Sequence, residues 1–124
     1  MKDQRPVFFN LIKIRMPVGS VTSIIHRVTG ILLASGTPFG IYLLKMSLQD
    51  SHGYIETISL FDNPAFKIVA LLFIWAFTHH LLAGLRHLLS DIDVGSHLPT
   101  ARISAWIVNC TAVLVASLSV GALF

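Results

Sequence analysis

Histidine and arginine side chains recur at helical spacing in the segment 78–91, which is otherwise largely apolar. At about 100° per residue, positions three or four residues apart fall on the same stripe of a helix. Imidazole and guanidinium groups are costly inside an apolar helix, so each one is a candidate functional group. One stripe consists of His80, Gly84, His87 and Asp91, and the neighbouring stripe consists of His79, Ala83, Arg86 and Ser90.

A histidine followed one turn later by a glycine suits the binding of a planar macrocycle. Imidazole is an axial ligand of haem iron, and the missing side chain of Gly84 would let a flat ring approach the backbone. His79 and His80 both qualify as the ligand, and their spacing does not separate them. His87 and Arg86, about two turns closer to the helix end, are candidates for binding the haem propionates. The alternative is that His80 only forms a hydrogen bond to a neighbouring helix.

A second polar group opens an earlier apolar stretch. Ser23, Arg27, Gly30 and Ala34 share a stripe, with His26 beside it. A hydroxyl and a guanidinium one turn apart can donate hydrogen bonds to a carbonyl or a carboxylate. A quinone head group is one candidate ligand and a haem propionate is another. Alternatively, Arg27 lies near the helix start and reaches lipid phosphate.

Three long apolar stretches position these groups. The chain is 54% hydrophobic and only 12% charged, whereas soluble domains have about 25% charged residues. Roughly 20 residues are needed to cross the hydrocarbon core of a membrane, and the stretches at about 20–48, 64–90 and 100–124 are long enough. We therefore predict an all-α membrane protein with three transmembrane helices, in which residues 1–124 form a single domain.

Helix-starting signals precede each stretch. Ser20 is a candidate N-cap for the first span, and Pro64 and Pro99 lie where a helix start tolerates proline. Pro38 lies inside the first span, where we expect it to kink the helix without breaking it.

The distribution of charge predicts the orientation in the membrane. The N-terminal segment 1–19 is basic, whereas the first loop, 49–63, has acidic residues and no Lys or Arg. The positive-inside rule then places the N-terminus and segment 1–19 at the cytoplasmic face and the C-terminus outside. The start resembles neither a signal peptide nor a transit peptide, which favours a multi-pass protein of the bacterial inner membrane. The charges concerned are Lys2, Arg5, Lys13 and Arg15 in the first segment, and Asp50, Glu56 and Asp62 in the loop.

Three motifs together resemble the family of cytochrome b556 subunits of succinate dehydrogenase, which are membrane anchors of respiratory complex II. They are Arg5-Pro6, the pattern S-x-x-H-R-x-[ST]-G at 23–30, and the pattern H-x-x-x-G-x-R-H-x-x-x-D at 80–91. The resemblance extends over the whole chain in length, span count and motif order. It implies that residues 1–124 are a single membrane-anchor domain and that the three transmembrane helices form part of a haem-binding helical bundle.

The resemblance implies a role for each matching residue. His80 would be the axial ligand of haem b, in preference to His79. Ser23 and Arg27 would line the quinone site. The haem propionates and pocket would involve His26, Arg27, Gly84 and His87.

The resemblance also implies partners. A second hydrophobic anchor subunit would supply the other haem ligand, and flavoprotein and iron–sulfur subunits would deliver electrons from succinate to ubiquinone or menaquinone. Membrane lipid would surround the chain, and we expect no nucleic-acid partner. Two alternatives are a fumarate reductase anchor, and a small non-redox membrane protein, such as a transporter subunit or assembly factor, whose polar residues only pack helices.

Overall fold

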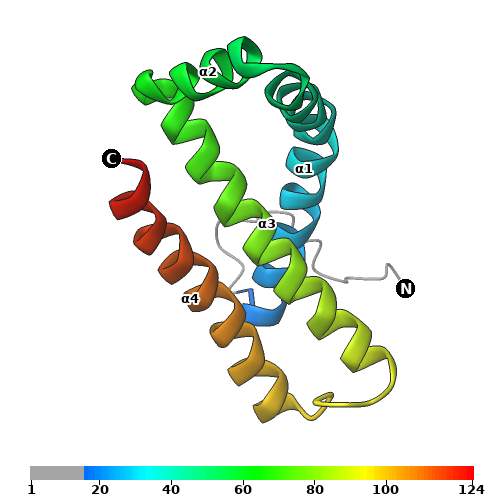
Figure 1. The fold of residues 1–124 in the computed structure, drawn as a ribbon. Helices are drawn as coiled ribbons and strands as arrows, with labels where there is room; N and C mark the ends of the chain where they lie inside the picture. Colours follow the sequence, from blue (N-terminus) through cyan, green and yellow to red (C-terminus); the bar gives the residue numbers. More distant parts are fainter. Residues whose placement is uncertain (1–15) are drawn as a thin grey trace, which may run out of the picture.

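The computed structural model describes residues 16–124, and their regular structure is entirely helical. Three of the helices are long and apolar enough to cross a membrane, which confirms the prediction of an all-α membrane protein with three spans. The predictions that fall on residues 1–15, including the Arg5-Pro6 motif, lie outside the described residues. The elements are α1 (Val18–Gln49), α2 (Ser51–Ser59), the 3-10 turn η1 (Leu60–Asp62), α3 (Pro64–Asp91) and α4 (Leu98–Leu123) (Figure 1).

Helices α1 and α3 run antiparallel and pack closely through the first half of α1. At the start of α1, Gly19 faces the guanidinium of Arg86, near the end of α3. Further along α1, Gly30 lies against the ring of His80, and a Cβ atom there would be only 3.0 Å from its Cε1 atom. Glycine suits this contact because it lets the helix backbone approach an imidazole directly.

Helix α4 packs against α3 through small side chains. The buried apolar residues on these two helices are four alanines and one valine. Small residues allow transmembrane helices to approach closely, but they interlock weakly compared with larger side chains. Polar contacts between α3 and α4 are therefore important for holding the two helices in position. The buried apolar residues are Ala76, Ala83, Ala105, Val108 and Ala112.

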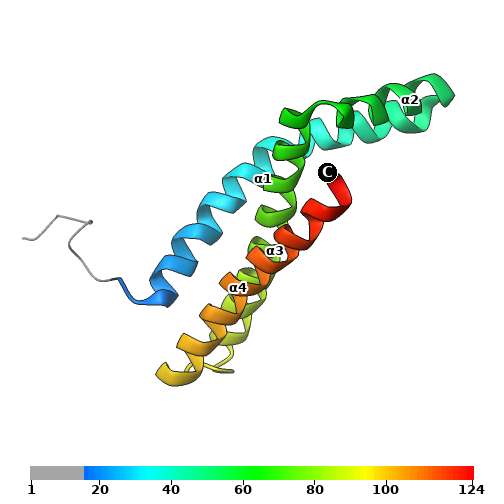
Figure 2. The same cartoon turned by 90° about the vertical axis from the view of Figure 1, so that its left-hand side faces the viewer.

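The second half of α1 diverges from the bundle. The helix remains continuous through Pro38, and Figure 2 shows it changing direction in its second half, coloured cyan to teal. A proline inside a helix removes one backbone hydrogen bond and clashes with the preceding turn, which accounts for a bend here. The expected kink without a break is therefore confirmed.

The connection between α1 and α3 is helical, and the prediction of a loop at 49–63 is wrong. Asp50 caps α2 by accepting a hydrogen bond of 2.7 Å from the backbone N–H of Gly53. Gly53 in turn packs on the backbone carbonyl of Met46 in α1, so α2 folds back along the end of α1 (Figure 2). The prediction of Ser20 as an N-cap is also wrong. Helix α1 begins at Val18 with Pro17 in the N-cap position, so Ser20 lies within the first turn of the helix.

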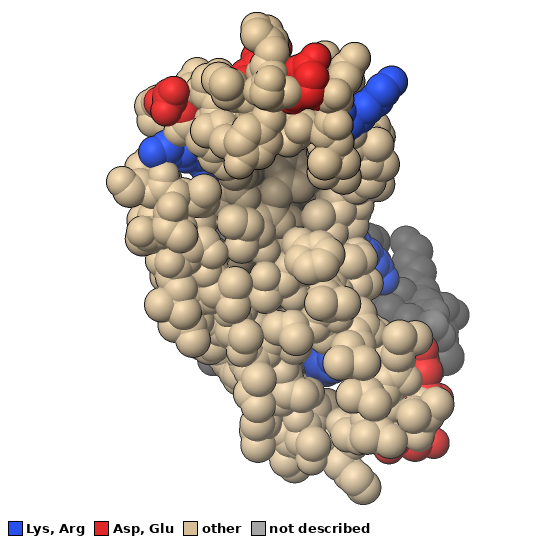
Figure 3. All heavy atoms as spheres, viewed as in Figure 1, with Lys and Arg blue, Asp and Glu red and all other residues tan. Residues whose placement is uncertain are grey.

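The surface is that of a multi-pass membrane protein. Figure 3 shows acidic side chains at the two ends of the molecule and a largely uncharged band between them. Large apolar side chains are exposed along all three long helices, among them Ile31, Leu81 and Leu118. Such a surface is suited to contact with lipid tails and with other transmembrane helices.

Candidate functional site

Three histidine side chains meet where the first half of α1 packs on the second half of α3. The rings of His26 and His80 stack, with centroids 4.1 Å apart and planes inclined by 13°. His87 lies about two turns further along α3, its ring tilted and its centroid 5.3 Å from that of His26. The structure thus joins the stripe of α3 that carries His80 and His87 to the polar start of α1.

The hydrogen bonds of His80 define its tautomer. Its Nδ1 atom lies 3.0 Å from the backbone carbonyl of His26, and a carbonyl can only accept, so Nδ1 carries the proton. Thr29 lies 3.4 Å from the same nitrogen and directs its own hydroxyl to backbone carbonyls of α1. The Nε2 atom of His80 therefore keeps its lone pair. A histidine whose other nitrogen donates to a carbonyl is oriented as metal-binding histidines are.

Two glycines make room for the stacked imidazoles. Gly30 accommodates the ring of His80, and a Cβ atom at Gly84 would lie 3.3 Å from Nε2 of His26. The missing side chain of Gly84 thus admits the His26 ring. A cavity of about 270 Å³ lies beside this contact and is open at the side. It is lined by His80, Leu81, Gly84, Leu85 and Leu88.

His79 points away from this cluster, into the seam between the three long helices. Its side chain is 1% exposed, and its Nε2 atom lies 3.0 Å from Oδ1 of Asn109 in α4. The amide nitrogen of Asn109 donates to Oγ1 of Thr22 in α1 at 3.1 Å. His79 and His80 are adjacent in sequence, yet only His80 belongs to the stacked cluster.

Sequence reasoning missed Asn109 and Thr22. A lone Asn in an otherwise apolar span is costly unless it is paired, and this signal was available for Asn109. Thr22 carried no comparable signal, because threonine commonly bonds to the carbonyl one turn earlier in its own helix. Thr22 does so here, at 3.0 Å to Val18.

Ser23 and Arg27 stand one turn apart on α1, as their spacing predicted. Arg27 is exposed and Ser23 is half-buried. Among residues 16–124, no hydrogen bond holds either side chain to another helix. A hydroxyl and a guanidinium on one face can donate to an oxygen-bearing ligand from outside the chain.

Arg86 faces α4 and not the histidine cluster. Its Nε donates to the hydroxyl of Ser104 at 3.0 Å, and its Nη2 donates to the carbonyl of Ala101 at 3.2 Å. These contacts fasten the end of α3 to the start of α4. The sequence predicts both Arg86 and His87 as candidates for binding the haem propionates. Of these two residues, only His87 lies at the histidine cluster.

Comparison with known proteins identifies relatives along nearly the whole chain. A family model described as "Succinate dehydrogenase/Fumarate reductase transmembrane subunit" matches residues 1–119. The chain is 32% identical over 109 residues to the succinate dehydrogenase cytochrome b556 subunit of Coxiella burnetii, covering 87% of each chain. It is 28% identical over 118 residues to the cytochrome b556 subunit of Paracoccus denitrificans, covering 95% of this chain and 91% of the relative. This chain therefore belongs to the family of succinate dehydrogenase/fumarate reductase transmembrane subunits.

Proposed function

We propose that this chain is the electron-transfer membrane anchor of a succinate:quinone oxidoreductase. It binds haem b jointly with a second anchor subunit and forms part of the site where quinone is reduced. The observation that carries the proposal is the orientation of His80, whose Nδ1 is fixed by the His26 carbonyl at 3.0 Å. The names of the relatives, all cytochrome b subunits of succinate dehydrogenase, support the same function.

The donor set fits haem. His80 offers the Nε2 atom of an imidazole whose Nδ1 donates to a carbonyl, and bound haem iron would accept and release single electrons there. His26 and His87 offer ring nitrogens to propionates, and Arg27 offers a guanidinium. Gly84 keeps the α3 backbone accessible beside a cavity of about 270 Å³. His80 would hold the iron from this chain, and the second anchor subunit would supply the other ligand.

The quinone site on this chain consists of Ser23 and Arg27. Their donors stand on one face of α1, where Arg27 is exposed and Ser23 is half-buried, within one turn of His26. Hydrogen bonds from these donors to a quinone carbonyl stabilise the negative charge that develops on oxygen during reduction. The partners of this chain in the complex are flavoprotein and iron–sulfur subunits on the cytoplasmic side. The N-terminus of this chain lies at the same face of a bacterial inner membrane.

A fumarate reductase anchor is the second candidate, because the matching family covers both enzymes. The chemistry of the haem and quinone donors is the same in either direction. We favour the succinate dehydrogenase direction because of the names of the relatives. A non-redox packing role has no support from the family to which the chain belongs.

The haem assignment is tested in the purified complex by a dithionite-reduced difference spectrum. We expect a b-type α-band that is lost or strongly diminished in His80→Ala. His52→Ala is the matched control, because this imidazole is 90% exposed on α2 and its removal should leave the band unchanged. A normal band and haem content in His80→Ala would show that this residue is not the ligand.

The quinone assignment is tested by steady-state kinetics with succinate and a soluble quinone. We expect Arg27→Ala and Ser23→Ala to raise the KM for quinone, while the activity with an artificial acceptor that takes electrons from the soluble subunits stays normal. Lys45→Ala and Ser35→Ala are controls, since both residues are exposed on the same helix. Normal quinone kinetics in both site variants would exclude these residues from the site.

A further inference from the structure

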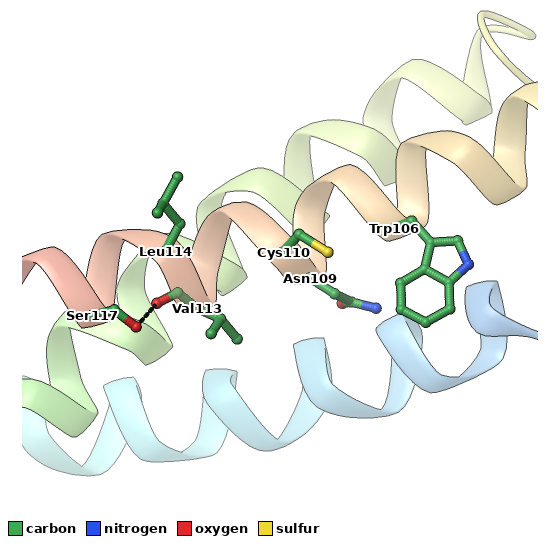
Figure 4. Close-up of a pocket in the computed structure, with 6 residues that line it drawn as sticks. All are labelled: Trp106, Asn109, Cys110, Val113, Leu114 and Ser117. Carbon is green, nitrogen blue, oxygen red and sulfur yellow. Dashed lines mark hydrogen bonds between the residues drawn. The ribbon is translucent and has the colours of Figure 1, made fainter.

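We propose that Asn109, acting with Thr22, is a positioning residue for the haem ligand. It holds His79 inside the bundle and thereby fixes the rotation of α3 that presents His80 to the haem site. The inference rests on the proposed role of His80 and adds a residue of α4 to the machinery. Figure 4 shows the Asn109 side chain projecting from α4 toward α1.

The hydrogen bonds of Asn109 connect three helices, from His79 in α3 to Thr22 in α1. The amide nitrogen of Asn109 donates to Oγ1 of Thr22 at 3.1 Å, so its Oδ1 is the atom that faces His79. Because an amide oxygen can only accept, Nε2 of His79 carries the proton in their 3.0 Å contact. The Thr22 hydroxyl lies 3.0 Å from the carbonyl of Val18 and 3.3 Å from Oδ1 of Asn109, and it can donate to either oxygen.

The hydrogen bond from His79 to Asn109 is the main polar contact between a buried side chain of α3 and helix α4. The buried apolar residues between these helices are mostly alanines, which give close approach and little resistance to rotation or sliding. The other described tie, from Arg86 to Ser104 and Ala101, lies about two turns away at the end of the helix. The azimuth of α3 at the level of the histidines is therefore held by His79.

Adjacent residues of a helix point about 100° apart, so fixing His79 also fixes His80. With His79 held between α1 and α4, the His80 ring is directed at the His26 carbonyl and the stacked His26 ring. A rotation of α3 would break both arrangements together. It would also carry a second imidazole, His79, toward the ligand position.

His79 depends on Asn109 for its only described partner. Its Nδ1 is buried and has no hydrogen-bond partner within residues 16–124. Replacing Asn109 with Leu leaves both ring nitrogens buried without a partner, which is a costly state in an apolar interior. The imidazole is then driven to move, and α3 moves with it.

The test measures haem geometry in the whole purified complex. Asn109→Leu and Thr22→Val should shift the low-spin g-values of the oxidised haem in electron paramagnetic resonance, because these report the orientation of the ligand rings. They should also speed haem loss to an acceptor apoprotein by roughly tenfold for Asn109→Leu, the lower end for groups that orient metal ligands. Thr22→Ser keeps the hydroxyl and should have the g-values and the rate of haem loss of the wild type.

Thr78→Val is the matched control. Thr78 precedes His79 and bonds to the carbonyl of Ile74 in its own helix at 2.8 Å, as Thr22 does to Val18. A simple loss of a threonine hydroxyl at this depth would affect both variants equally. The inference requires that Thr22→Val shifts the haem spectrum and that Thr78→Val does not.

A double-mutant cycle with His79→Leu tests the route. If Asn109 acts through His79, Asn109→Leu should have little further effect in the His79→Leu background. Equal effects in both backgrounds, or wild-type g-values in Asn109→Leu and Thr22→Val, would overturn the inference. If Asn109→Leu prevents assembly, Thr22→Val and the double variant decide. Failure of this inference is distinguishable from failure of the proposed function. The proposed function fails only if His80→Ala keeps its haem.

Discussion

The contact between Gly30 and His80 gives a quantitative prediction for Gly30→Ala. The added methyl group would lie 3.0 Å from Cε1 and 3.5 Å from Nδ1 of the imidazole, so the ring must shift by a few tenths of an ångström. The ring has little freedom to do so, because its Nδ1 is bonded to the His26 carbonyl and its face stacks on the His26 ring at 4.1 Å.

The loss of haem affinity in Gly30→Ala depends on how much the added methyl group strains the haem-bound protein. Overpacking a well-filled interior by one methyl group costs about 1–3 kcal/mol, and a shift of a few tenths of an ångström places this site at about 1–2 kcal/mol. The gain in helix propensity from glycine to alanine is present with and without haem, so it does not change haem affinity. Without haem the ring can relieve the strain by giving up its contacts with His26, whereas bound iron would hold the ring in place. The strain therefore lowers haem affinity, and each 1.4 kcal/mol is a factor of ten. We expect haem to bind about 5- to 30-fold more weakly.

The assay is the rate of haem transfer from the purified complex to an excess of apomyoglobin, together with the haem-to-flavin ratio. Gly40→Ala is the control, because it makes the same substitution on the same helix and its Cβ would meet nothing within 4 Å. If Gly30→Ala releases haem at the wild-type rate, the close approach of α1 to His80 does not govern haem binding. Faster release in both variants would refute the reasoning equally.

Two further predictions concern the frame that supports the site. Gly36→Leu should weaken assembly of the complex in detergent, because any Cβ at this position overlaps the ring of Phe73. Thermal unfolding followed by size exclusion measures the loss, and an unchanged midpoint would contradict the α1–α3 contact. Asp50→Ala should cost α2 about 1 kcal/mol by removing its N-cap, seen as faster amide exchange at Gly53 and its neighbours. Exchange unaltered there would show that α2 does not depend on this cap.

Much of the fold was predictable because the membrane makes the sequence simple to interpret. Three apolar stretches of sufficient length had to be helices, since helices satisfy their own backbone hydrogen bonds in lipid. The short helix α2 was missed because it is a connection with mixed composition, and because its stability comes partly from Gly53 packing on α1. Helix α1 begins at Val18, two residues before the start at about residue 20 that its sequence predicts.

The candidate site was predictable in its residue types and not in its contacts. Helical spacing alone placed His80, Gly84 and His87 on one stripe of α3, and placed Ser23 and Arg27 on one stripe of α1. It left His79 and His80 as equal candidates from spacing, because adjacent positions differ only by a rotation of the helix. The partners of Arg86 could not be inferred either, because they lie on another helix.

The sequence by itself determined three apolar helices and the two segments where polar groups gather within them. Periodicity along one chain is enough for this, because the stripes of a helix depend only on its geometry. Only the tertiary structure decided which stripe faces which neighbour. It turned His79 into the seam with Asn109 and Thr22, and set His80 against the His26 carbonyl. Two adjacent imidazoles thereby acquired different environments, because each contacts residues that are distant in sequence.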